Sequence, residues 1–441
     1  MNANQVVKRF LTISPVVIAR SDHIISRSNI SENALKVLRR LQKAGYQAHL
    51  VGGGVRDLLL GREPKDFDVA TDASPEEVRD TFRNCRLIGR RFRLAHVHFG
   101  RDIIEVATFR GSHNGEDSIA AQSDQGMILR DNVFGTIEED ALRRDFTVNA
   151  LYYNLKDFSV IDYVGGVEDL QAGLLRLIGD PETRFREDPV RLLRAIRFAA
   201  KLGFNIHKDS EAPIFQLGDL LDEVPAARLF EEVLKLFLGG VAVHTFEKLR
   251  HYDLFRHLFP STDKSLEIEE QQFPIQFVLQ GLKNTDTRIR EDKPVTPAFL
   301  FAVLLWEPVR QRAQQAMERG VIPQQAMFDA ADEVISEQVQ KIAIPRRFSS
   351  QMKEIWSMQS RLEKSRSGKR ARRLLENPRF RAAYDFLLLR AAASEADQQL
   401  ADWWTRYQEN QPQAQSTGKS SPPRKRRPRS RRRKPAAAGG Q

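Results

Sequence analysis

The spacing of apolar residues along the chain predicts a mixed region followed by a helical one. Between Ser31, a candidate N-cap, and Gly45, a candidate helix end, apolar residues recur at helical intervals. After that helix come short apolar or alternating runs typical of strands, at residues 46–50, 67–70, 94–99, 103–109, 150–153 and 160–164. The first region therefore predicts a small mixed sheet with helices.

From residue 188 onward the pattern is helical. Asp188 and Pro189 suit the N-cap and first turn of one helix, and Pro225 is expected to start another that runs to Leu238. The fold class is α+β, with a mixed-sheet head, an all-helical neck and body, and a disordered basic tail. We expect the divisions to be an arm at 1–30, the head at 31–180, the neck at 181–245, the body at 246–410 and the tail at 411–441.

The net charge of +11 is concentrated at the C-terminus. Residues 411–441 carry ten Lys or Arg and no acid, which leaves 59 basic against 58 acidic residues in the rest of the chain. Such a Pro-, Ser- and Arg-rich segment cannot bury enough apolar surface to fold alone, and its charge suits a polyanion. We expect this tail to bind nucleic acid; a solvated solubility tail is the alternative.

Cys85 is the only cysteine, so an internal disulfide or a Cys-based zinc cluster is excluded, and a reducing cytoplasm is expected. The apolar stretch after Lys8 and Arg9 is interrupted by Pro15 and lacks a signal-peptidase site. No stretch reaches the ~18 apolar residues of a membrane span. We therefore expect no membrane segment.

Candidate chemistry is concentrated in Leu50 to Thr71, which reads LVGGGVRDLLLGREPKDFDVAT. Backbone amides of a glycine turn at Gly52-Gly53-Gly54 can bind a triphosphate. Asp66 and Asp68, two residues apart on a strand, project to the same side and can bind Mg²⁺. The alternatives are a solvated acidic pair and a glycine turn needed only for backbone geometry. Arg56 can contact phosphate or pair with Asp57.

Together with three later motifs, this segment resembles the nucleotidyltransferase superfamily that contains bacterial poly(A) polymerases and tRNA CCA-adding enzymes. The later motifs are RRDFTVNALYYN from Arg143, DYVGGVEDL from Asp162 and EDPVRLLRAIRFAAKLGF from Glu187. The likeness spans about residues 31–240 and implies a polymerase-β-like head. It also implies a two-metal transfer of a nucleotide, with Mg²⁺ bound by Asp66 and Asp68.

The resemblance implies roles for further residues. Asp145 matches an assisting carboxylate of the family, with Glu105 as its competitor for the third acidic position. The residues that would bind the incoming nucleotide are Gly52, Gly53, Arg56, Arg143, Arg144, Asp188 and Arg191, the last two at the edge of its base. Two alternatives remain open: the arginines beside Asp145 can form a surface ion-pair cluster, and Asp188 can simply cap a helix.

The segment LIGRRFRLAHVHFGRDIIEVATFRG from Leu87 and the helical C-terminal region resemble the poly(A) polymerase branch more than the CCA-adding one. We therefore expect template-independent addition of AMP from ATP to RNA 3′ ends, promoting RNA turnover, by a cytoplasmic monomer. Expected partners are RNA 3′ ends, ATP and RNA-degradation proteins. The alternatives are a tRNA CCA-adding enzyme and a noncatalytic RNA-binding adaptor.

Overall fold

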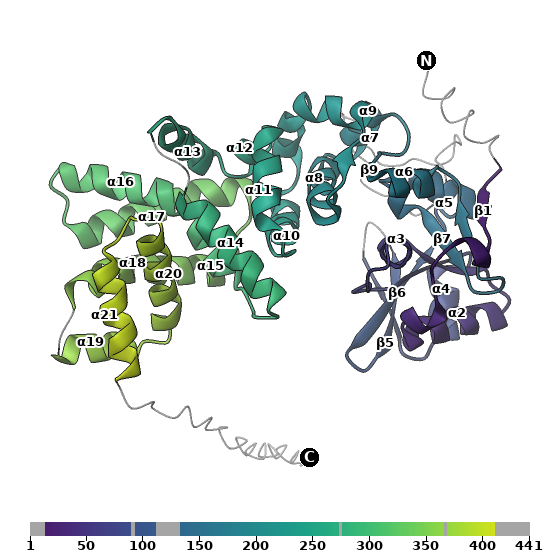
Figure 1. The fold of residues 1–441 in the computed structure, drawn as a ribbon, viewed down its shortest axis with the longest axis horizontal. Helices are drawn as coiled ribbons and strands as arrows, with labels where there is room; N and C mark the ends of the chain where they lie inside the picture. The colour runs from purple at the N-terminus through teal and green to yellow at the C-terminus, as the bar shows by residue number, and fades with distance from the viewer. Residues whose placement is uncertain (1–13, 90–92, 112–132, 273–275, 366–367, 411–441) are drawn as a thin grey trace, which may run out of the picture.

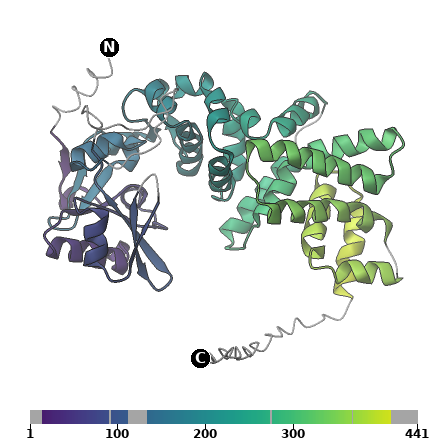
Figure 2. The same ribbon diagram turned by 180° about the vertical axis from the view of Figure 1, so that it is seen from behind.

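The computed structural model describes residues 14–89, 93–111, 133–272, 276–365 and 368–410 (Figure 1). The basic tail at 411–441 lies outside these ranges. Figures 1 and 2 show the sheet-containing head at one end, a helical body at the other, and α8, α10 and α11 between them. This confirms the predicted α+β class.

The head is built on an eight-stranded mixed sheet in the order β1-β8-β7-β2-β3-β6-β5-β4. Its strands are β1 (Val16–Ile18), β2 (Ala48–Val51), β3 (Asp68–Thr71), β4 (Cys85–Ile88), β5 (Leu94–Phe99), β6 (Asp102–Thr108), β7 (Leu151–Asn154) and β8 (Val160–Asp162). Only β3 and β6 are parallel neighbours. The six strands predicted from the pattern are present, each within two or three residues of its expected bounds.

The two edge strands were not predicted. β1 lies in the segment assigned to the arm and pairs with β8, which ties residues 16–18 to the head. Val16 and Val17 are both more than half exposed, so this edge strand shows no alternation between a buried and a solvated face. The hydrophobic pattern that identifies half-buried strands is therefore missing there.

Helices cover the two faces of the sheet unequally. The head helices are α2 (Glu32–Lys43), α3 (Gly53–Leu59), α4 (Pro75–Thr81), α5 (Ile137–Arg143) and α6 (Gly166–Ala172). The Ser31 hydroxyl caps α2, as predicted, by accepting from the Asn33 amide at 3.2 Å. Val37 and Leu41 of α2 pack on the same apolar core as Val69 of β3. The opposite face carries only a small cluster around Ala70, which leaves room there for polar groups.

The neck and body are helical, apart from a short parallel pair of strands, β9 (Leu174–Leu175) and β10 (Asn205–Ile206). The helices are α7 (Pro181–Glu187), α8 (Val190–Leu202), α9 (Lys208–Glu211), α10 (Ala226–Phe237), α11 (Ala242–His251), α12 (Phe255–Leu258), α13 (Pro260–Gln272), α14 (Gln276–Arg290), α15 (Pro297–Leu304), α16 (Trp306–Glu318), α17 (Pro323–Lys341), α18 (Arg346–Lys364), α19 (Gly368–Leu375), α20 (Phe380–Ala392) and α21 (Gln398–Glu409). In the described ranges, no helix combines the length and apolarity needed to cross a bilayer.

One predicted helix start was wrong in detail. Pro189, rather than Asp188, occupies the N-cap position of α8, and no side chain caps that helix. The Asp188 carboxylate instead accepts a hydrogen bond from Arg228 Nη2 of α10 at 2.7 Å. Asp188 therefore does not cap α8, because its side chain pairs with Arg228, which is 40 residues away in the sequence.

Candidate active site

The glycine turn and the second aspartate lie side by side because their strands are paired. β2 and β3 are antiparallel neighbours, with Val51 opposite Asp68. Gly52 follows directly at the N-cap of α3 with φ 75° and ψ −140°, a conformation that only glycine adopts without strain. A Cβ added there would lie 3.8 Å from Asp68 Oδ2 and 3.7 Å from Arg144 Nη1. The turn thus places an open backbone between a carboxylate and a guanidinium.

Glu105 joins the aspartates on the open face of the sheet. It is the parallel register partner of Asp68, while the next pair, Val69 and Val106, points into the main core. Burial, followed by the negative charge of Glu105, raises the pKa of Asp68 to about 6, against an opposing effect of Arg144. Asp66, two residues earlier, is exposed at the entrance of β3. The negative charges of Glu105 and Asp66 both act on Asp68, and a cation bound at Asp68 would relieve this repulsion.

These acids fit the way in which proteins bind magnesium. In the part of the chain that the structure describes, no three His, Cys, Asp or Glu side chains converge as a complete ligand set. Mg²⁺ does not require such a set, because it is usually bound by one or two carboxylates together with water and substrate phosphates. Asp66 and Asp68 supply two carboxylates of this kind beside the glycine turn.

Asp145 is bound by protein groups on both oxygens. Its Oδ1 accepts from the Phe146 amide at 2.8 Å and from Asn149 Nδ2 at 3.3 Å, and its Oδ2 accepts from Arg194 Nε at 2.8 Å. Burial alone would raise the pKa of Asp145, but the charge and hydrogen bonds of Arg194 outweigh it and lower the pKa to about 2. Asp145 thus links the head to α8.

Arg144 is held in place by two buried neighbours. Its Nε donates to Asp140 Oδ2 at 3.1 Å and to the Tyr152 hydroxyl at 3.0 Å, while its Nη2 donates to Asp140 at 2.9 Å. The Tyr152 hydroxyl itself donates to Asp140 at 2.6 Å. This network directs Nη1 of Arg144 toward Gly52, where an anionic ligand can receive it.

The other arginines predicted to bind the nucleotide are engaged elsewhere. Arg56 is buried and donates to Asp57 Oδ1 at 2.7 Å and to Asn149 Oδ1 at 2.5 Å, so the alternative in which it pairs with Asp57 is observed. Arg143 donates to the Gly111 carbonyl. The bonds to Asn149 and to the Gly111 carbonyl join segments of the head that are distant in the sequence.

Asp188 and Arg191, which were expected to contact the edge of the base, lie at the junction of α7 and α8. Arg191 Nη1 donates to the Arg184 carbonyl at 2.7 Å and to Glu187 Oε2 at 3.0 Å. Arg184 in turn donates to the carbonyls of Arg143 and Arg144, both at 2.7 Å. Asp188 and Arg191 are thus fixed to the same loop that presents Arg144.

A cavity of about 310 Å³ combines most of these groups. It is lined by Gly52, Gly53, Gly54, Arg56, Asp57, Lys65, Asp66, Asp68, Arg144, Asp145, Asn149, Arg194, Arg197, Phe198 and Lys201. Arg143, Asp188 and Arg191 are not part of this lining. Arg194, Arg197, Phe198 and Lys201 were missed as site residues, although their spacing places them along one face of α8, a signal that the sequence contains.

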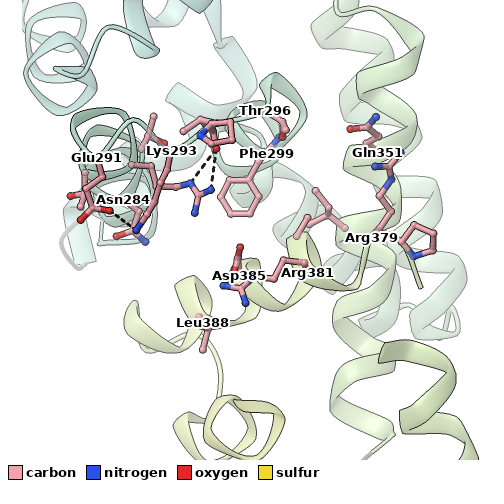
Figure 3. Close-up of a pocket in the computed structure, with 18 residues that line it drawn as sticks. Asn284, Glu291, Lys293, Thr296, Phe299, Gln351, Arg379, Arg381, Asp385 and Leu388 are labelled. Carbon is pink, nitrogen blue, oxygen red and sulfur yellow. Dashed lines mark hydrogen bonds and ion pairs between the residues drawn. The ribbon is translucent and has the colours of Figure 1, made fainter. Parts of the chain in front are cut away.

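A second cavity, of about 500 Å³, lies in the helical body (Figure 3). Its labelled residues come from α14, α15, α18, α20 and the turns beside them. Arg288 Nη2 donates to the Pro294 carbonyl at 3.0 Å, and Arg381 Nη2 lies 3.0 Å from Asp385 Oδ1. The lining contains no pair of neighbouring carboxylates comparable to Asp66 and Asp68.

A mixed sheet that joins a glycine turn to an Asp-x-Asp pair defines a nucleotidyltransferase. Family models match three parts of the chain: "Poly A polymerase head domain" at residues 48–176, "Probable RNA and SrmB- binding site of polymerase A" at 203–266 and "Polymerase A arginine-rich C-terminus" at 319–437. A protein named Poly(A) polymerase I from Salmonella typhimurium is 54% identical over 405 residues, which cover 90% of this chain and 87% of that protein. The chain belongs to the bacterial poly(A) polymerase family.

More distant relatives share the fold. Poly(A) polymerase I of Haemophilus influenzae is 49% identical over 89% of this chain and 88% of its own. A CCA-adding enzyme of Lactobacillus helveticus is 37% identical over 48% of this chain and 52% of its own. Among solved structures, the Bacillus stearothermophilus CCA-adding enzyme in complex with CTP has a TM-score of 0.57 at 25% identity, covering 85% of this chain and 80% of that one.

Proposed function

We propose that this enzyme adds AMP from ATP to RNA 3′ ends without a template, by a two-metal mechanism. One observation supports this most strongly. The Asp66 and Asp68 pair lies beside the Gly52 turn in a chain that matches Poly(A) polymerase I over 90% of its length. The presence of both Asp66 and Asp68 argues against a noncatalytic adaptor.

Asp66 and Asp68 would bind the magnesium ions. When bound, magnesium activates the primer hydroxyl and stabilises the charge of the departing pyrophosphate. We further propose that Glu105, rather than the expected Asp145, is the third carboxylate. Glu105 is the strand neighbour of Asp68, whereas Asp145 is held by Arg194 and two further donors. Asp145 then acts by positioning α8 against the head.

The incoming nucleotide would bind across the turn and α8. The amides of Gly53 and Gly54 and the Nη1 of Arg144 face the place of the triphosphate. Asp188 and Arg191 would hydrogen-bond the edge of the base, since both carry their polar groups at the α7 to α8 junction beside the loop of Arg144.

The RNA would extend from the head along the neck and body, to which we assign residues 181–245 and 246–410. The match of residues 203–266 to a probable RNA-binding model supports this path. We place the enzyme, as a monomer, in the cytoplasm, with RNA turnover as the outcome and RNA-degradation proteins as partners. Deleting residues 411–441 should raise the KM for RNA several-fold at low salt and leave the KM for ATP unchanged, because counterion release is lost.

The reaction is tested with a short RNA primer, Mg²⁺ and each nucleoside triphosphate in turn. A ladder formed with ATP alone is expected. Limited addition that requires CTP and a tRNA end would identify a CCA-adding enzyme instead. An Asp68→Asn variant serves as the control and should bind RNA without extending it.

A further inference from the structure

A groove of about 840 Å³ on the head is lined by a row of cations from α2. The cations are Lys36, Arg39, Arg40 and Lys43, and all four are exposed. Their spacing of three and four residues places them on one face of the helix. Among the residues that the structure describes, the lining of this groove contains no acid. The outer face of α2 therefore presents concentrated positive charge.

Most of this charge has no partner within the protein. Lys36 Nζ lies 3.7 Å from Glu32 Oε2, but both side chains are mostly exposed, so this pair neutralises little. In the part of the chain that the structure describes, the side chains of Arg39 and Lys43 form neither an ion pair nor a hydrogen bond. Their charges are available to a molecule bound in the groove.

Two aromatic side chains add apolar surface to the lining. Phe82 is buried, and the Cζ of Arg40 lies 5.1 Å from the centroid of its ring. This cation–π contact holds Arg40 at the groove without neutralising its charge. Phe99, the last residue of β5, is only partly buried and packs against the main core. The groove thus combines a row of cations with a small apolar surface.

The groove lies on the far side of the sheet from the aspartates. Leu41 of α2 packs on the same apolar core as Val69 of β3, whereas the adjacent Asp68 side chain lies on the opposite face. Figures 1 and 2 show α2 and α4 on the side of the head turned away from α8, α10 and α11. The RNA path proposed above runs from the aspartates along these neck helices, away from the groove.

The lining favours a protein over the other polyanions. Single-stranded RNA is bound where aromatic rings lie open for stacking on bases, and the Phe82 ring is buried beneath Arg40. The tail of this chain at 411–441 carries ten cations and no acid, so the groove repels it. The choice of protein over RNA rests in part on the proposed function, which sets the RNA path. Charge complementarity then points to an acidic polypeptide.

We propose that the α2 groove docks an acidic segment of a partner protein. Lys36 and Lys43 are seven residues apart on the helix, a distance of about 10 Å at the rise of 1.5 Å per residue. The matching segment carries about three carboxylates over that distance, and an apolar side chain beside them contacts Phe99. Complementary charges of this kind select the partner and accelerate its association.

The test measures binding of a labelled peptide, in which glutamates flank one phenylalanine, to the full-length protein by fluorescence anisotropy. Unlabelled oligo(A) is present in excess to occupy the surfaces that bind RNA. The groove variant combines Arg39→Gln with Lys43→Gln. The control variant combines Lys283→Gln with Arg290→Gln, which removes one exposed lysine and one exposed arginine from α14. We expect the groove variant to bind the peptide at least fivefold more weakly than the control variant.

Two further measurements test the chemistry of the site. A peptide with glutamine in place of every glutamate should lose the difference between the two variants. Arg39→Glu combined with Lys43→Glu should bind a lysine version of the peptide more tightly than wild type does. The kcat and both KM values for AMP addition should stay within twofold of wild type in the groove variant, because the groove lies across the sheet from the aspartates.

The proposal is overturned if the groove and control variants bind the peptide within twofold of each other. It is also overturned if oligo(A) displaces the peptide from wild type and binds the groove variant more weakly, because the groove then takes RNA. A wild-type dimer that the groove variant dissociates in sedimentation would identify a second copy of this chain as the occupant instead. A wild type that adds no AMP would refute the proposed function and leave the peptide comparison valid.

Discussion

The cavity beside the glycine turn of the head and the cavity of the helical body differ in how their charges are paired. In the body cavity, Arg381 is matched to Asp385 one helical turn away, and Arg288 is bound to a backbone carbonyl. In the head cavity, Asp68 borders Glu105, and Arg197 has no acceptor for its buried Nε. Unpaired charge held in a partly buried place is costly to fold, and it is maintained where a ligand supplies the missing partner. This difference in charge pairing favours the head cavity over the body cavity as the candidate active site.

The largest expected effect is the difference in kcat between a variant that loses a carboxylate in the head cavity and one that loses a carboxylate in the body cavity. Asp68→Asn should lower kcat by about 10³-fold, because a metal ligand and its charge are lost from the reacting centre. Asp385→Asn in the body removes a carboxylate from an exposed ion pair and should leave kcat within twofold. Steady-state AMP incorporation on the same primer measures both. Equal losses in the two variants would contradict the assignment of the site to the head.

A second contrast lies between two carboxylates of the head, Glu105 and Asp145. Glu105→Gln should lower kcat by about 10²-fold with little change in the unfolding midpoint, because Glu105 is half exposed and lies 3.2 Å from His96 Nε2. Asp145→Asn removes the charge that pairs with Arg194, which costs about 2 kcal/mol of unfolding free energy. Urea denaturation and primer extension on both variants decide between the carboxylates. If the Asp145→Asn variant were as stable as wild type but inactive, Asp145 rather than Glu105 would be the third carboxylate of the active site.

The free energy of unfolding should depend on pH through the ionisation of Asp145. Its folded pKa of about 2 lies below the ordinary value of 3.8, so the folded state favours the ionised form. The stabilisation, about 2 kcal/mol, is therefore fully present above pH 4 and is lost as the pH falls toward 2. Urea midpoints at pH 5 and pH 2.5 measure this loss, with Asp145→Asn as the variant in which it should disappear. If the urea midpoint of that variant still fell between pH 5 and pH 2.5 by as much as in wild type, other carboxylates would be responsible for the loss of stability in acid.

The smallest expected effect is in the body. Arg381 is 72% exposed in its side chain and pairs with Asp385 within α20, so Arg381→Gln should change the free energy of unfolding by less than about 1 kcal/mol. Its turnover on a short primer should match that of wild type. If turnover on that primer fell more than tenfold, the body cavity would take part in the reaction and would no longer differ from the head cavity in this respect.

The local sequence was sufficient to predict most helices and strands of the head and to identify the glycine turn with its two aspartates. The helical repeat after Ser31 and the alternation around Phe67 are set by neighbours a few residues apart, so the helix and strand could be predicted. The order of the motifs along the chain was enough to indicate the family. The edge strand Val16–Ile18 could not be predicted, because it shows no burial pattern of its own and exists only by pairing with β8.

The sequence by itself determined that a glycine turn precedes two aspartates on one side of a strand, because that geometry follows from backbone spacing alone. Only the tertiary structure decided which distant groups those aspartates meet. Glu105 reaches Asp68 through the parallel pairing of β3 and β6, and α8 brings Arg194 to Asp145 and Arg197 to the cavity. Whether these charged side chains are neutralised depends on partners that are distant in the sequence, 37 residues away for Asp68 and Glu105 and 49 for Asp145 and Arg194, so a local pattern cannot predict them.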